Sequence, residues 1–141
     1  MYKIKIYTIG KTKEKWLDAA IEEYTKRLSP DLTIEWILSK DKESFDECVK
    51  KIKDFICLDP QGVQFESEEF STFIHKEFQK GGPRLNIIIG GAEGLGSSQL
   101  TKATHILSLS KLTFTHQMTR LILLEQLYRA FQIHKGTRYH K

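Results

Sequence analysis

Apolar and polar positions alternate along this chain in two periods, one typical of strands and one typical of helices. Residues 3–9 alternate with period two, as a half-buried strand does. Residues 13–28 repeat with helical period before Pro30, and the apolar face of this helix is expected to carry Trp16, Ala20, Tyr24 and Leu28. The pattern continues in the same way, with further strands expected at 32–38, 55–59, 85–89 and 105–110 and further helices at 43–54, 67–80, 97–103 and 115–135.

Five strands alternating with five helices predict an α/β fold, with a mostly parallel sheet flanked by helices on both faces. The strands at 55–59 and 85–89 are almost continuously apolar, as the central strands of a parallel sheet are. The chain shows no internal repeat, low-complexity stretch or linker, so residues 1–141 are expected to form one domain. It also has no run of about 18 apolar residues, so neither a membrane span nor a membrane partner is expected.

The cysteines and histidines give no sign of a metal site or a disulfide. Cys48 and Cys57 form no C-x-x-C pattern and are interpreted as reduced thiols. His75 lies beside an apolar helical stripe and His105 opens a strand, with no acid or cysteine at ligand spacing, so no metal is expected. Because the first segment resembles a strand rather than a signal peptide, a cytoplasmic location is predicted.

Positive charge is concentrated toward the end of the sequence. From residue 111 onward there are six basic residues and one acid, Glu125, while the whole chain carries a formal net charge of +4. Such a segment suggests an anionic partner that meets one face of the protein. A solvated basic tail that only keeps the protein soluble is the alternative.

The stretch LNIIIGGAEGLGSS, residues 85–98, places four glycines directly after a buried strand. Ligands of open α/β sheets bind outside the carboxyl ends of the strands, where glycines let the backbone approach a ligand closely. The spacing lacks the G-x-G-x-x-G dinucleotide pattern, and serine stands where a nucleotide-binding P-loop has its lysine. A nucleotide hydrolase is therefore disfavoured, and a tight turn without any ligand is the other alternative.

Two further loops should leave the same edge of the sheet. CLDPQG follows the third expected strand and SLSKLTFTHQMTR follows the fifth, so both can converge with the glycine loop on one crevice. The helix after the last loop carries His116 and Arg120 in its first turns.

At this point the motifs match a known family. IIIGGAEGL, LSLSKLTFTHQMTR, EQLYRAFQI and the terminal YHK, together with TIGK near the start, resemble the SPOUT-class ribosomal RNA large-subunit methyltransferase H family. The resemblance covers the whole chain. It implies a C-terminal trefoil knot, a homodimer, and transfer of a methyl group from S-adenosylmethionine to N3 of a pseudouridine in helix 69 of the 23S rRNA within the large subunit or the 70S ribosome.

The resemblance also implies which positions bind the cofactor. Matched motif by motif, these lie at the end of the third expected strand, directly after the fourth, and at the end of the fifth and the loop beyond it: Leu58, Gly90, Gly91, Leu109, Ser110, Lys111, Leu112, Thr113 and Phe114. Backbone amides and carbonyls can recognise adenine, and the apolar side chains can enclose it. No metal is required for such a pocket.

Methyl transfer to an imide nitrogen requires in-line positioning of the two reactants and removal of one proton. Candidates for the base, or for positioning the nucleobase, are His116, Arg120, Tyr139 and His140. The family pattern implies that the terminal Tyr139 and His140 fold over the cofactor site, whereas the residues alone would suggest a disordered end. Arg129 could face phosphate or pair with Glu125 four residues earlier.

The last helix leaves two interpretations open. It is apolar around much of its circumference, which suits a helix packed against both the sheet and a second subunit, or the central core helix of a monomer. At the level of function, the alternative to a methyltransferase is a non-catalytic ribosome- or RNA-binding module with the same fold.

Overall fold

The computed structural model describes residues 1–140 and confirms the expected alternation of strands and helices. The strands are β1 (Tyr2–Ile9), β2 (Leu32–Ser39), β3 (Ile56–Gln64), β4 (Arg84–Ile89) and β5 (His105–Ser108). The helices are α1 (Lys15–Leu28), α2 (Lys42–Lys50), α3 (Ser67–Gly81), α4 (Ser97–Lys102) and α5 (His116–Lys135).

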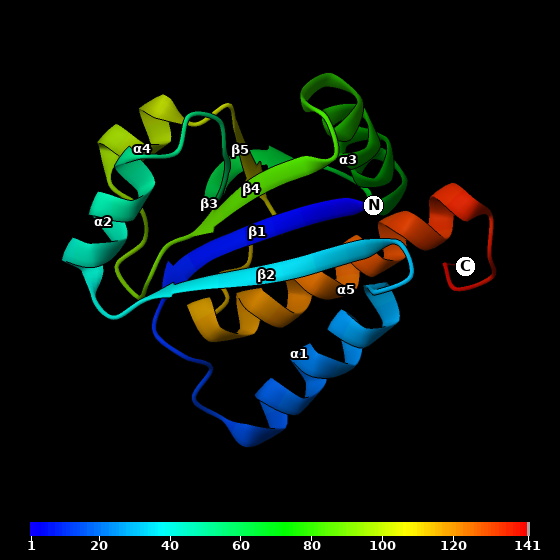
Figure 1. The fold of residues 1–141 in the computed structure, drawn as a ribbon, viewed down its shortest axis with the longest axis horizontal. Helices are drawn as coiled ribbons and strands as arrows, with labels where there is room; N and C mark the ends of the chain where they lie inside the picture. Colours follow the sequence, from blue (N-terminus) through cyan, green and yellow to red (C-terminus); the bar gives the residue numbers. More distant parts are fainter. Residues whose placement is uncertain (141) are drawn as a thin grey trace.

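The five strands form one sheet in the order β2-β1-β4-β3-β5, and every pairing is parallel. Helices α1, α3 and α5 pack on one face, while α2 and α4 pack on the other (Figure 1). This arrangement confirms the α/β class with helices on both faces. Because all strands run the same way, the loops that follow them emerge at one edge of the sheet.

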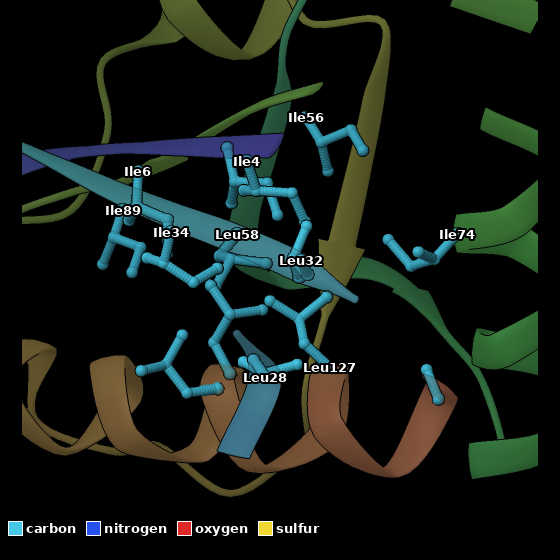
Figure 2. Close-up of a cluster of buried hydrophobic side chains, with 14 of the residues drawn as sticks. Ile4, Ile6, Leu28, Leu32, Ile34, Ile56, Leu58, Ile74, Ile89 and Leu127 are labelled. Atoms are coloured by element: carbon cyan, nitrogen blue, oxygen red, sulfur yellow. The ribbon is translucent and has the colours of Figure 1, made fainter. Parts of the chain in front are cut away.

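The larger core lies between the sheet and helices α1, α3 and α5. Ile4 and Ile6 of β1 are fully buried there, because alternate residues of a strand point to the same face. Leu127 of α5 packs into the same cluster, as Figure 2 shows. A smaller core on the other face joins Phe45 and Val49 of α2 to strand residues that include Tyr7, Cys57 and Ile88.

Helix α5 is the central helix of the larger core. It packs against both α1 and α3, and its fully buried residues are Leu123, Leu124, Leu127 and Ala130. Thr115 caps its start by accepting a hydrogen bond from the backbone N–H of Met118, and Gly136 ends it with φ of 76°. Contacts within one chain therefore bury most of the apolar residues around α5.

The expected apolar face of the first helix is partly wrong. Trp16 is 60% exposed, whereas Leu17 and Ile21 are buried together with the correctly expected Leu28. The face is rotated by about one residue because Leu17, Ile21 and Leu28 form a continuous stripe that packs in the larger core. The second helix also ends at Lys50, four residues earlier than expected.

The trefoil knot implied by the resemblance stays a prediction. The parallel sheet and the helices that flank it are consistent with that knot. Within residues 1–140, no helix combines the length and the apolar character needed to cross a bilayer. Both cysteines are free thiols, with Cys57 buried and Cys48 half-buried.

β3 passes very close to β5 at Gly62. A Cβ atom built on Gly62 would lie 2.6 Å from the carbonyl oxygen of Ile106 and 2.8 Å from the carbonyl carbon of Leu107. The register between β3 and β5 also shifts between Leu58 and Val63, so the pairing of the two strands is irregular here. Only glycine allows this close approach of the two backbones.

We expect Gly62→Ala to lower the free energy of unfolding by about 2 kcal/mol, since the added methyl group must displace backbone. Gly81→Ala is the matched control, because a Cβ there meets nothing within 4 Å. Urea unfolding of both variants measures the difference. Equal stability of the two variants would contradict the close approach.

Candidate functional site

A hollow lies beside the middle of β3 and the ends of β4 and β5, and the loops after β4 and β5 form much of its wall. We call it the glycine-loop hollow. Its lining residues come from the middle of β3, the ends of β4 and β5, the loops after β4 and β5, and the first turn of α5: Leu58, Asp59, Pro60, Ile89, Gly90, Gly91, Gly94, Ser108, Leu109, Ser110, Leu112, Phe114, His116 and Thr119. The predicted convergence of the glycine loop and the loop after β5 is confirmed, whereas the third expected loop is wrong: residues 57–62 lie inside β3 and reach the hollow from the stretch where the register of that strand shifts.

The glycine loop forms a turn that is closed by a backbone hydrogen bond. Gly94 donates its backbone N–H to the carbonyl of Gly91 at 3.0 Å and has φ of 78°. A Cβ on Gly90 would lie 2.7 Å from the carbonyl carbon of Gly94, so this position needs glycine. Next to the turn, the backbone N–H of Gly96 donates to Gln99 Oε1 at 3.0 Å, and Gln99 Nε2 donates to Asp46 Oδ1 at 2.7 Å. The glycine loop is thereby attached to α2.

The loop between β5 and α5 is shaped by its own serines. Ser108 Oγ donates to the carbonyl of Ser110 at 2.9 Å, and the backbone N–H of Leu112 donates to Ser110 Oγ at 3.0 Å. This conformation leaves the Leu112 side chain 73% exposed at the mouth of the hollow. An apolar side chain held in solvent beside a hollow is suited to cover a flat apolar ligand.

Seven of the nine expected cofactor positions line the hollow: Leu58, Gly90, Gly91, Leu109, Ser110, Leu112 and Phe114. Lys111 and Thr113 lie on the same loop but are exposed and do not line it. Asp59 and Thr119 line it without having been predicted. Asp59 could have been suspected, because it is the acid that ends the apolar strand expected at 55–59.

A second hollow adjoins the first and shares Gly91, Gly94 and His116 with it. The glycine-loop hollow has a volume of about 110 Å³ and the second one about 510 Å³. Ligand pockets typically enclose 300–1,000 Å³, so a nucleoside-sized ligand would extend beyond the smaller hollow. Lys13 and Lys40 line the second hollow, which we call the lysine hollow.

Of the four residues considered for the reaction, His116 is the one that reaches both hollows. Burial, together with the nearby charges of Arg120 and Lys13, lowers the pKa of His116 below its ordinary value. Its surroundings therefore favour the neutral form of the ring. Its buried Nδ1 finds no hydrogen-bond partner within residues 1–140.

Arg120 is 1% exposed and is directed to the loop after β1 rather than to either hollow. Its guanidinium donates to the carbonyls of Ile9 and Gly10, both at 2.9 Å, and to Thr12 Oγ1 at 3.1 Å. Gln117 holds the same loop, accepting from the backbone N–H of Lys13 at 3.0 Å. Arg120 thus positions the β1–α1 loop against the start of α5.

The terminal residues lie far from the glycine-loop hollow of their own chain. Tyr139 donates from its hydroxyl to Glu125 Oε2 at 2.8 Å, and His140 Nδ1 lies 2.9 Å from a guanidinium nitrogen of Arg129. The hydroxyl of Tyr139 also lies 3.4 Å from that of Tyr24. In Figure 1 the C-terminus lies at the opposite end of α5 from the helix start, where His116 stands.

Most of the basic charge near the end of the sequence is already engaged. Arg129 pairs with Glu125 at 2.7 Å, which confirms the helical ion pair. Lys135 pairs with Asp31, and Arg120 is buried. The exposed cations that remain in this segment of the described chain include Lys111 and Arg138.

Comparisons with known proteins agree with this geometry. Residues 2–140 match the family model described as predicted SPOUT methyltransferase. The chain is 52% identical over 141 residues to a ribosomal RNA large subunit methyltransferase H of Protochlamydia amoebophila, covering 100% of both chains. It is 41% identical to the protein of the same name from Clostridium beijerinckii, covering 98% of this chain and 99% of that one.

Solved structures support the fold. A probable methylase family protein from Haemophilus influenzae superposes with a TM-score of 0.61 at 18% identity, over 98% of this chain and 70% of that one. A putative methyltransferase from Legionella pneumophila, solved with bound SAM, superposes with a TM-score of 0.51 at 12% identity, over 92% and 66%. From the matches over the whole chain, we conclude that it belongs to the SPOUT methyltransferases, in the ribosomal RNA large subunit methyltransferase H family.

Proposed function

We propose that this protein transfers a methyl group from S-adenosylmethionine to N3 of a pseudouridine in helix 69 of the 23S rRNA, on the assembled large subunit or 70S ribosome in the cytoplasm. The observation that supports this most is the hollow formed by the glycine loop and the β5–α5 loop, in a chain whose full-length relatives are named rRNA methyltransferases.

The residues of the glycine-loop hollow fit a methyl donor of this kind. Gly90 allows the tight turn that forms this wall of the hollow, since a Cβ there would lie 2.7 Å from the carbonyl carbon of Gly94. Leu58, Leu112 and Phe114 provide apolar surface for an adenine ring, and backbone N–H and C=O groups of the loops provide polar contacts. When bound, the sulfonium of the donor supplies an activated methyl group.

The chain itself must orient the nucleobase and accept the imide proton. His116 stands between the glycine-loop hollow and the lysine hollow, so it can contact a base placed beside the donor. Its lowered pKa keeps the ring neutral and able to accept a proton. Arg120 acts as a positioning residue, because it holds the loop that carries Lys13 near the same base.

We further propose that the protein acts as a homodimer. Tyr139 and His140 can serve a methyl-transfer site in this arrangement only if they reach the hollow of a second copy, since their own hollow lies beyond the far end of α5. A dimer would also enlarge the surface available to a large RNA.

Mass mapping of large-subunit rRNA from cells with and without this gene tests the proposed function. A methyl group on one pseudouridine of helix 69 that is missing without the gene supports it. A tritiated-methyl assay on ribosomes that lack the modification completes the test. Ribosome binding without methyl transfer would instead identify a non-catalytic RNA-binding module.

Gly90→Ala should weaken S-adenosylmethionine binding by about 10-fold or more, since a backbone shift costing about 1.4 kcal/mol already corresponds to that factor. Gly96→Ala in the same loop is the control, because a Cβ there meets nothing nearer than 3.8 Å. Isothermal titration calorimetry measures both variants. If both bind like the unmodified protein, the donor site lies elsewhere.

His116 gives the reaction a pH dependence. Because its pKa is lowered, the proton-accepting form is already predominant at neutral pH, and kcat should fall only as the pH drops through a value below 6.5. His116→Gln should remove this acidic limb and lower kcat by about 100-fold, the lower range for a lost general base. A variant that keeps the acidic limb would assign the base to another group.

A mixing experiment tests the role of the tail. Removal of residues 139–141 should spare donor binding and reduce turnover, while Gly90→Val should remove donor binding. When the two impaired proteins are mixed and allowed to exchange subunits, activity should rise above that of either one, because one heterodimeric site then combines an intact hollow with an intact tail. No recovery despite subunit exchange shown by native mass spectrometry would mean that the tail does not act across a dimer.

A further inference from the structure

A strongly cationic surface lies on the sheet away from both hollows. It occupies the α2 side of the sheet, where β1 and β4 begin, and forms an open hollow of about 310 Å³. Its cationic residues are Lys3, Lys5, Lys51, Lys53 and Arg84, and we call it the cationic sheet face.

This surface exists because the helices cover only part of the sheet. Lys3 and Lys5 point to the same side as Tyr7, since they are separated from it by even numbers of residues along β1. Tyr7 is buried beneath α2 in the smaller core, whereas the two lysines come before that cover and stay half-exposed. The turn after α2 adds Lys51 and Lys53, both exposed.

The positive charge of this surface is poorly neutralised. Lys3 pairs with Glu35 at 2.6 Å. Over residues 1–140, Lys5, Lys51, Lys53 and Arg84 form no ion pair. Asp54 is the other nearby acid. The cations Lys3, Lys5 and Arg84 together hold the pKa of the Glu35 carboxyl below its ordinary value.

The cations are spread out rather than aimed at one point. Lys3 and Lys5 are about 6.6 Å apart along β1, and Arg84 lies opposite Lys3 on the neighbouring strand, about 4.8 Å away. The sheet surface beneath these cations is held in place by Asn86. Its side chain accepts a hydrogen bond from the Tyr7 hydroxyl at 3.3 Å and donates one to the carbonyl of Asp54 at 3.1 Å. A fixed array of this kind suits a chain of phosphates better than a single small anion.

We propose that the cationic sheet face binds the sugar–phosphate backbone of ribosomal RNA, as a second contact separate from the methyl-transfer site. The inference rests on the proposed function for the identity of the polyanion. Lys3 lies about 20 Å along β1 from Ile9, where the strand reaches the hollows. A folded RNA is long enough to contact both regions, so this surface would orient the substrate by phosphate contacts without reading its sequence.

The test compares a variant that lacks two charges of the cationic sheet face with a variant that lacks two exposed charges elsewhere. Lys53→Gln/Arg84→Gln neutralises the cationic sheet face, and Lys26→Gln/Lys76→Gln, at exposed positions on α1 and α3, is the control with the same change in net charge. Binding to purified large ribosomal subunits and to protein-free large-subunit rRNA is measured by filter binding across a salt series. Methyl transfer and S-adenosylmethionine affinity are measured on the same preparations.

We expect the Lys53/Arg84 variant to bind RNA at least about 10-fold more weakly at low salt, with the slope of log K against log salt reduced by about 1.5, as for two lost phosphate contacts. The control variant should keep the original slope, and both variants should bind the donor normally.

Equal binding by the two variants would overturn the proposal. So would unchanged RNA binding combined with lost binding to phosphatidylserine vesicles, which would indicate a membrane surface. If RNA binding depends on this face but no methyl group is transferred, the proposed function fails while this inference stands.

Discussion

The parallel pairing of β4 between β1 and β3 is the constraint on which the rest of this structure depends. Ile87, Ile88 and Ile89 are all buried, and their side chains alternate between the two cores. Because this strand lies in the middle of the sheet, the loop after it emerges between the loops that follow β1 and β3. The glycine loop is therefore central to both the glycine-loop hollow and the lysine hollow.

Polar side chains then hold the loops around that centre. Gln99 ties the glycine loop to Asp46 of α2, and Arg120 ties the β1–α1 loop to the start of α5. A guanidinium buried to this extent is costly unless its hydrogen bonds are made. The carbonyls of Ile9 and Gly10 and the hydroxyl of Thr12 accept hydrogen bonds from the guanidinium. Arg120 is therefore directed to the β1–α1 loop and does not line either hollow.

Charge along the sequence and charge in space differ in this protein. The basic residues that dominate the C-terminal third are mostly paired or buried, as Arg129, Lys135 and Arg120 show. A cluster of cations that form no ion pair within residues 1–140 lies instead at the start of β1 and β4 and after α2. An anionic partner remains a sound inference from composition, but the surface that would meet it is assembled from distant segments.

The sequence by itself determined the order of elements, the α/β class and the convergence of the loops after β4 and β5, because apolar periodicity and strand direction are local properties. Of the nine cofactor positions that the family resemblance implies, seven line the hollow. Only the tertiary structure decided that Trp16 faces solvent, that Arg120 points away from the hollow and that Tyr139 packs on Glu125. Each of these depends on which side chains meet across the fold, and contacts between residues more than 10 positions apart leave no periodic trace in the chain.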